Sequence, residues 1–140
     1  MAIILIVDDD PTVRLIAGEL LRSQDHAIVE AEDGDEALKI VASMAVDLVV
    51  LDMLMPNKDG LETIVELRRR KPDIRILAIS SGGRMEPGHL LRTAMMFGAD
   101  ECLQKPLRLD TFSEVVAAVL AQPARASSPM VRCGQADARS

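Results

Sequence analysis

Short runs of apolar residues alternate along the chain with longer segments in which apolar residues recur every three or four positions. The runs at residues 3–7 and 48–51 have the length and β-branched content of strands buried on both faces. Further strands are expected at residues 27–31, 74–79 and 101–104. The segments with the helical period lie at residues 11–21, 37–44, 61–67, 90–95 and 109–120. The pattern therefore predicts a repeating strand–helix unit along most of the chain.

Strands that alternate with helices are typical of the α/β class, in which one parallel sheet carries helices on both faces. We therefore expect a doubly wound (βα)5 domain in residues 1–122. The periodic pattern stops at Pro123, and residues 123–140 are rich in small and polar side chains. This stretch is predicted to be a disordered tail or a linker.

Polar residues follow four of the predicted strands. Asp8 and Asp9 follow the first strand, Asp52 ends the third, Ser80 follows the fourth and Lys105 follows the fifth. Because all strands of a parallel sheet end at one edge, where such folds bind ligands, we expect these side chains to lie close together.

Three aspartates at this edge repel one another unless something positive lies between them. Asp10 is explained as the N-cap of the following helix, with Pro11 at the first helical position. The pattern still leaves Asp8, Asp9 and Asp52, and two like charges about 4 Å apart repel by about 4 kcal/mol at an effective dielectric near 20. Lys105 offsets only part of this charge. Oxygen ligands without nitrogen or sulfur favour Mg²⁺, so the sequence predicts a magnesium site.

Composition and charge exclude several classes of function. The chain has 140 residues, a net charge of −6, two Phe and neither Trp nor Tyr. An acidic chain with few aromatic rings does not suit direct nucleic-acid binding. The cysteines, Cys102 and Cys133, do not form a disulfide framework. Since we find neither a signal peptide nor an apolar run of about 20 residues, we expect a cytoplasmic protein without a membrane segment.

The motifs "ILIVDDDP", "DLVVLDMLMPNKDG", "ILAISS" and "GADECLQKP" resemble those of response-regulator receiver domains of two-component signalling. The resemblance covers residues 3 to about 121 and is greatest to single-domain regulators of the chemotaxis type. It implies a flavodoxin-like sheet with strand order 2-1-3-4-5. It also implies a phosphoprotein that switches the binding of a partner protein.

The resemblance assigns roles to individual residues. It implies that Asp52 is the phosphoacceptor and forms an aspartyl phosphate with a phosphoryl group from a histidine kinase or phosphotransfer protein. Mg²⁺ would be held by Asp52, by Asp9 directly, by Asp8 mainly through water and by the backbone carbonyl of Leu54. The hydroxyl of Ser80 would bond the phosphoryl group.

Lys105 matches the lysine of the family, whose peptide bond to Pro106 would be cis. The fourth helix, fifth strand and fifth helix would form the partner face. There, Met95 and Met96 are interpreted mainly as packing residues, with an exposed, adaptable binding surface as the alternative. The neighbouring basic run at residues 68–71 is interpreted as the solvated end of a helix.

The chain departs from the family pattern at a few positions. Cys102 replaces the usual aromatic switch residue, and we interpret it as a small buried core residue rather than a redox group. Neither Leu54 nor Gly82 can orient a water molecule, so we expect slow autodephosphorylation. The segment 80–98, with Pro87 and Gly88, is expected to hold a long loop beside the site.

Three alternatives to a single-domain receiver remain at this stage. The chain could be the receiver part of a larger regulator or of a hybrid kinase. It could be a Mg²⁺-dependent phosphohydrolase, although Leu54 stands where such enzymes place a second acid. It could also be a structural module without phosphorylation, which the complete set of polar residues argues against. We expect no enzymatic turnover beyond self-catalysed phosphotransfer and slow autodephosphorylation.

Overall fold

The computed structural model describes residues 1–54, 60–80 and 87–122, with the backbone alone at residues 87–91. The strands are β1 (Ile3–Val7), β2 (Ala27–Ala31), β3 (Leu48–Asp52), β4 (Arg75–Ser80) and β5 (Glu101–Gln104). The helices are α1 (Pro11–Arg22), α2 (Gly34–Ser43), α3 (Gly60–Arg70), α4 (Pro87–Phe97) and α5 (Leu109–Ala121). Strands and helices alternate through the described chain, as the hydrophobic pattern predicts.

The five strands form one parallel sheet in the order β2-β1-β3-β4-β5. β1 lies between β2 and β3, with Val7 opposite Ala31 on one side and Leu51 on the other. The predicted α/β class and the strand order 2-1-3-4-5 are confirmed.

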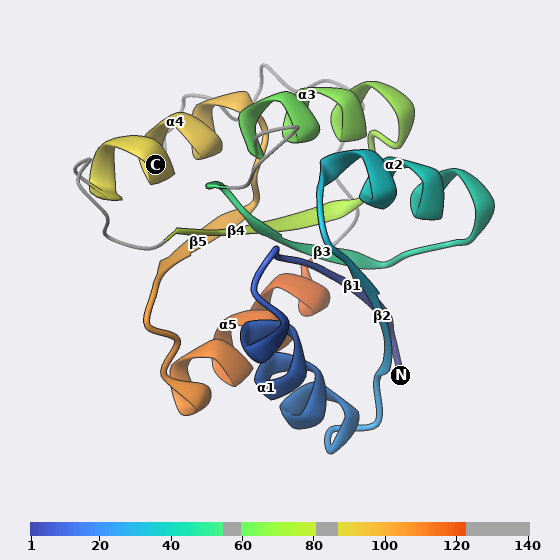
Figure 1. Ribbon diagram of the computed structural model, residues 1–140, viewed down its shortest axis with the longest axis vertical. Helices are drawn as coiled ribbons and strands as arrows, with labels where there is room; N and C mark the ends of the chain where they lie inside the picture. Colours follow the sequence, from blue (N-terminus) through green and yellow to red (C-terminus); the bar gives the residue numbers. More distant parts are fainter. Residues whose placement is uncertain (55–59, 81–86, 123–140) are drawn as a thin grey trace.

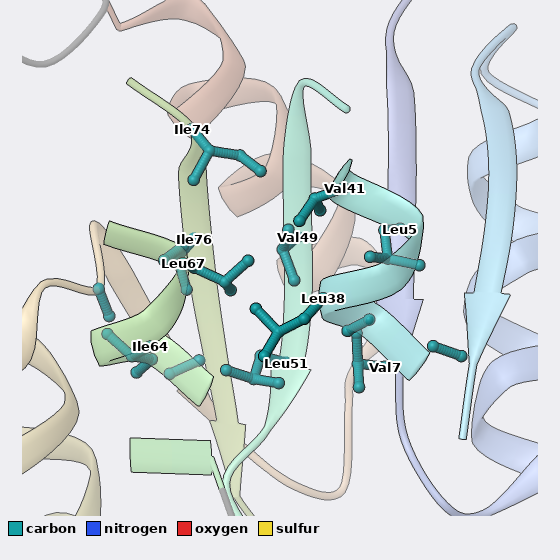
Figure 2. Packing of buried hydrophobic residues seen from close by; sticks show 14 of the residues in the cluster. Leu5, Val7, Leu38, Val41, Val49, Leu51, Ile64, Leu67, Ile74 and Ile76 are labelled. Carbon is teal, nitrogen blue, oxygen red and sulfur yellow. The ribbon is translucent and has the colours of Figure 1, made fainter. Parts of the chain in front are cut away.

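Helices cover both faces of the sheet (Figure 1). α2, α3 and α4 lie on one face, and α1 and α5 lie on the other. Side chains alternate between these faces along each strand. Leu5 and Val7 therefore join the core beneath α2 and α3, whereas Ile4 and Ile6 join the core against α1 and α5. Figure 2 shows the first of these cores, in which Leu38 of α2 lies over the central strands.

The start of α1 separates Asp10 from the other two aspartates. The Asp10 side chain accepts a hydrogen bond of 2.9 Å from the Thr12 amide, and Pro11 occupies the first helical position. The predicted N-cap is confirmed, and it fixes the point at which the chain, having left β1 after Val7, begins α1.

Several element boundaries differ from the sequence prediction. Asp33 is the N-cap of α2 rather than part of a turn, and its side chain accepts a bond from the Glu36 amide. Pro87 opens α4, so the predicted loop ends earlier than expected, in keeping with the preference of proline for the first turn of a helix. β4 runs one residue later than predicted and includes Ser80.

The basic run at the end of α3 is not a uniformly solvated helix end, and that interpretation is wrong for Arg68. Its side chain is only 15% exposed and forms an ion pair of 2.8 Å with Asp100. It also donates to the carbonyls of Gly98, Pro72 and Ile74. Arg68 thus joins α3 to the chain before β4 and to the turn between α4 and β5, whereas its neighbours Arg69–Lys71 are exposed.

Some expectations lie outside the described residues. These are the tail at residues 123–140, Cys133 within it, and Gly82 in the segment after β4. Among the helices that the structure describes, none combines the length and the apolar character needed to span a bilayer.

Candidate functional site

The carboxyl edge of the sheet brings the predicted acidic residues together. Asp8 directly follows β1 and Asp52 is the last residue of the adjacent β3. One carboxylate oxygen each of Asp8, Asp9 and Asp52 lies within 4.8 Å of the others. The cluster could therefore hold a cation, and hard oxygen donors suit Mg²⁺.

Asp8 is completely buried and has a partner for every polar group. Its amide donates to the Ala31 carbonyl at 3.1 Å, and its own carbonyl accepts from the Arg14 guanidinium at 2.6 Å. One carboxylate oxygen accepts from the Asp10 amide at 2.9 Å, and the other from Lys105 Nζ at 2.8 Å. Asp8 is thus held rigidly, with both carboxylate oxygens already bonded.

Asp9 contrasts with its neighbour. Its side chain is exposed, and within residues 1–54, 60–80 and 87–122 it makes neither a hydrogen bond nor an ion pair. Within this part of the chain its carboxylate oxygens have no bonded partner, unlike those of Asp8. The direct metal role of Asp9 and the indirect role of Asp8 stay predictions.

Asp52 is buried in a site that opposes its negative charge. Burial and the carboxylate of Asp8 raise the pKa of Asp52 to about 7, with a smaller contribution from Asp9. The Leu54 amide, 3.2 Å from Asp52 Oδ1, and the Lys105 ammonium act in the opposite direction. The largest of these effects is burial, so the site disfavours the charged form of Asp52, and a divalent cation would favour it.

Lys105 supplies the positive charge at this edge. Its Nζ lies 2.8 Å from Asp8 Oδ2 and 3.6 Å from Asp52 Oδ2. Burial opposes its charge, but the bond to Asp8 and the attraction of Asp52 raise the pKa of its ammonium overall. The Lys105–Pro106 peptide bond is cis, as the resemblance implies.

Ser80 is fully buried at the end of β4, and its carbonyl accepts a bond of 2.8 Å from the Lys105 amide. Ser80, the last residue of β4, and Lys105, directly after β5, are therefore neighbours at the carboxyl edge of the sheet. The Leu54 amide contacts Asp52, whereas the metal role of its carbonyl stays a prediction.

Cys102 lies on β5 opposite Ala78 and packs against the core beneath α2, α3 and α4. It is half-buried rather than fully buried. Burial, and then the charge of Glu101, raise the pKa of the Cys102 thiol. A raised pKa disfavours the thiolate, which supports a packing role over a redox role.

The end of α4 presents apolar side chains to solvent. Met96 is 81% exposed, and Met95 and Phe97 are also exposed. The interpretation of the two methionines mainly as packing residues is therefore wrong for Met96. The alternative, an adaptable apolar surface, agrees better with this exposure.

Sequence reasoning missed Arg14, which contacts the site from α1. Its guanidinium donates to the Asp8 carbonyl and to Glu30 Oε1 on β2. A signal was present, since an arginine one turn after the Asp10 cap stands close to an acidic edge. The helical pattern could not show which backbone group this arginine would reach.

Comparisons with known proteins agree with this geometry. The family model described as the response regulator receiver domain matches residues 4–117. The response regulator MprA of Mycolicibacterium vanbaalenii is 39% identical over 108 residues, which make up 76% of this chain and 45% of that protein.

Solved structures show the same likeness. The receiver domain of NtrX from Brucella abortus has a TM-score of 0.80 at 28% identity, covering 86% of this chain and 99% of that chain. The response regulator TrrA from Thermotoga maritima, solved in complex with Mg(2+)-BeF, has a TM-score of 0.75 at 35% identity, covering 85% and 99%. The chain spans about half of the length of the first curated relatives that it matches.

Proposed function

Because the chain belongs to the response regulator receiver family, we propose that it accepts a phosphoryl group on Asp52 and then changes its binding to a partner protein. The donor is the phosphohistidine of a histidine kinase or phosphotransfer protein. One observation carries this proposal: the oxygens of Asp8, Asp9 and Asp52 converge within 4.8 Å, next to the ammonium of Lys105.

The chemistry requires a carboxylate to attack a phosphoryl group that is itself negative. A new bond forms between an Asp52 oxygen and phosphorus, while the bond from phosphorus to the histidine nitrogen breaks. Catalysis of such a transfer rests mainly on positioning and on neutralisation of charge. Lys105 supplies one positive charge, and the Ser80 hydroxyl is proposed to donate to a phosphoryl oxygen.

Mg²⁺ is the proposed cofactor, and when bound it would neutralise charge shared by Asp52 and the phosphoryl oxygens. Asp9, whose oxygens are available, would bind the ion directly. Asp8, whose oxygens already accept from Lys105 and the Asp10 amide, would act mainly through water. The Leu54 carbonyl is the further proposed ligand. The Mg(2+)-BeF complex of TrrA supports the choice of metal.

The decisive test is the intact mass of the protein after incubation with acetyl phosphate and Mg²⁺. Wild type should gain one phosphoryl group and Asp52→Asn should gain none. Asp10→Asn is the matched control, since asparagine also caps helices and the side chain of Asp10 bonds the Thr12 amide rather than the site. The assignment of Asp52 as the phosphoacceptor would be refuted if Asp52→Asn gained a phosphoryl group. It would also be refuted if neither wild type nor any variant gained one with any donor or kinase.

We expect no further enzymatic turnover. Leu54 offers no acid to a phosphohydrolase mechanism, so phosphate monoesters should not be hydrolysed. The same apolar side chain cannot orient water, so the phosphoryl group should persist for longer than seconds. Leu54→Gln should shorten its lifetime several-fold, measured as loss of phosphoprotein with time, and Val65→Gln on the exposed face of α3 should not.

Output is proposed to occur through the face formed by α4, β5 and α5, where Met96 and Phe97 are exposed. The net charge of −6 supports protein partners rather than direct nucleic-acid contact. The cytoplasm is the proposed location. The second candidate is a receiver within a longer regulator or hybrid kinase. It is favoured by the coverage of MprA, of which the chain spans 45%. The mass of the native protein, detected with an antibody against this domain, separates the two.

A further inference from the structure

Arg14 contacts the backbone of the acidic pair, Asp8 and Asp9, from α1. Its Nη1 donates to the Asp8 carbonyl at 2.6 Å, and its Nε donates to Glu30 Oε1 at 2.9 Å. The arginine side chain is only 13% exposed. Glu30 also lies 3.8 Å from Arg22, so it stands between two arginines of α1.

The Asp8 carbonyl needs such a donor because the chain leaves the sheet at this point. The Asp8 amide still bonds to Ala31 of β2, but β1 has ended and the next residues turn into α1. A buried carbonyl without a partner is costly, and the Arg14 guanidinium satisfies this one.

This carbonyl belongs to the peptide unit that links Asp8 to Asp9. Since a peptide unit is planar, fixing its oxygen fixes the plane from which the Asp9 side chain departs. The Asp8 end is already held by the bonds to Ala31, Lys105 and the Asp10 amide. Asp9 has no bond of its own within the described residues, so its direction depends on this plane.

We propose that Arg14 is a positioning residue for the metal site: it holds the Asp8–Asp9 peptide so that Asp9 faces Asp52. Glu30 orients the guanidinium and compensates its charge. The inference rests on the proposed function, because it assigns Mg²⁺ to this site. What it adds to the proposed function is that Arg14, although positively charged, favours the binding of the cation.

Charge and geometry make opposite predictions here, and this makes the proposal testable. If Arg14 acted only through its charge, it would repel Mg²⁺, and its removal would strengthen metal binding. If it acts by positioning, its removal leaves Asp9 misdirected and weakens metal binding. The sign of the change in affinity therefore distinguishes the two.

The experiment is calorimetric titration of the unphosphorylated protein with MgCl2, comparing wild type with Arg14→Gln, Arg14→Lys and Glu30→Gln. Arg14→Gln should weaken Mg²⁺ binding by on the order of 10-fold, as is usual when a group that orients a metal ligand is lost. Arg14→Lys should restore part of the affinity, because a lysine can still donate to the carbonyl. Glu30→Gln should weaken binding most at low salt, where the uncompensated guanidinium is least screened.

Arg22→Gln is the matched control, since Arg22 also lies on α1 and pairs with Glu30 but does not contact Asp8. The affinity of this variant for Mg²⁺ should equal that of wild type. Amide NMR spectra of each variant, recorded without metal, confirm that it is folded. Unchanged or tighter Mg²⁺ binding by folded Arg14→Gln would overturn the proposal while leaving the proposed function intact. Absence of Mg²⁺ binding by wild type would overturn both, whereas an unphosphorylated Asp52 in a protein that binds Mg²⁺ would refute the function alone.

Discussion

The position of Asp52 lowers the stability of the folded protein, because its surroundings disfavour the negative charge that phosphoryl transfer requires. Burial and Asp8 raise its pKa to about 7 from an ordinary 3.8. Between these values the folded protein keeps a proton that the unfolded chain releases. The metal-free protein should therefore lose stability as the pH rises from about 4 to about 7.

We therefore expect Asp52→Asn to stabilise the metal-free protein. The gain in the free energy of unfolding should be larger at pH 8 than at pH 5. A shift of this size corresponds to about 4 kcal/mol at pH 8 as an upper value. Lys105 does not alter this pH dependence, because the stability from its raised pKa is fully present below the ordinary lysine value and is lost only above it. Urea unfolding with EDTA at the two pH values measures the difference, and equal gains at both would contradict it.

Single residues also show which parts of the site could be predicted from the sequence and which could not. Strand ends identified Asp8, Asp9 and Asp52, because every strand of a parallel sheet ends at one edge. The sequence did not show that Arg14 and Arg68 join separate elements. Both donate hydrogen bonds to backbone carbonyls, and a periodic pattern does not show which carbonyls will lie near a side chain in the folded protein. The resemblance, rather than the pattern, supplied the cis bond at Pro106.

At the scale of elements, α3 begins in close contact with the end of β3. A Cβ atom at Gly60 would lie 2.6 Å from Met53 Cα and 3.1 Å from the Asp52 carbonyl. The backbone of Met53, directly after Asp52, therefore leaves no space for a larger residue at position 60. Glycine at the first position of α3 is what allows the helix to approach the site.

Gly60→Ala should therefore lower stability by about 1–3 kcal/mol, as overpacking does, and slow the phosphorylation of Asp52. Gly18→Ala is the control, since its Cβ would meet Arg22 and Ile28 at 3.4 Å or more. Alanine within a helix there should be neutral or stabilise by up to about 1 kcal/mol. Chemical unfolding and acetyl phosphate reactions test both, and similar behaviour of the two variants would contradict the argument.

The contact of α3 with the α4–β5 turn gives a second prediction. Arg68→Ala leaves Asp100 and the Gly98 carbonyl without this donor in a poorly exposed site. Breaking such a buried pair costs about 3–5 kcal/mol. Arg69→Ala, which removes only an exposed pair with Glu66, should cost less than about 1 kcal/mol. Thermal unfolding compares them, and a small loss for Arg68→Ala would show that the connection is dispensable.

For the whole molecule, the site exists only when segments far apart in the sequence have folded together. Asp8 and Lys105, 97 positions apart, bond directly across the edge of the sheet. The order of the strands was implied by the resemblance, because alternation of strands and helices leaves several topologies open. Local pattern thus predicted the elements, whereas their arrangement needed the family or the structure.

A ligand that binds this composite site should stabilise the entire fold. Mg²⁺ at about 100 times its dissociation constant should add about 2.7 kcal/mol to the free energy of unfolding of wild type. Asp9→Asn should lose most of this gain, because Asp9 has the available oxygens, and Asp10→Asn should keep it. Melting temperatures with and without MgCl2 measure the effect, and equal gains in both variants would exclude Asp9 as a ligand.

The exposed Phe97 has a practical consequence. It ends α4 immediately before Gly98, whose carbonyl is held by Arg68. The chain has neither Trp nor Tyr, so it gives almost no signal in near-ultraviolet emission. A single tryptophan in place of Phe97 would therefore be the sole fluorophore of the protein. Its emission would follow the position of α4 in real time against a dark background.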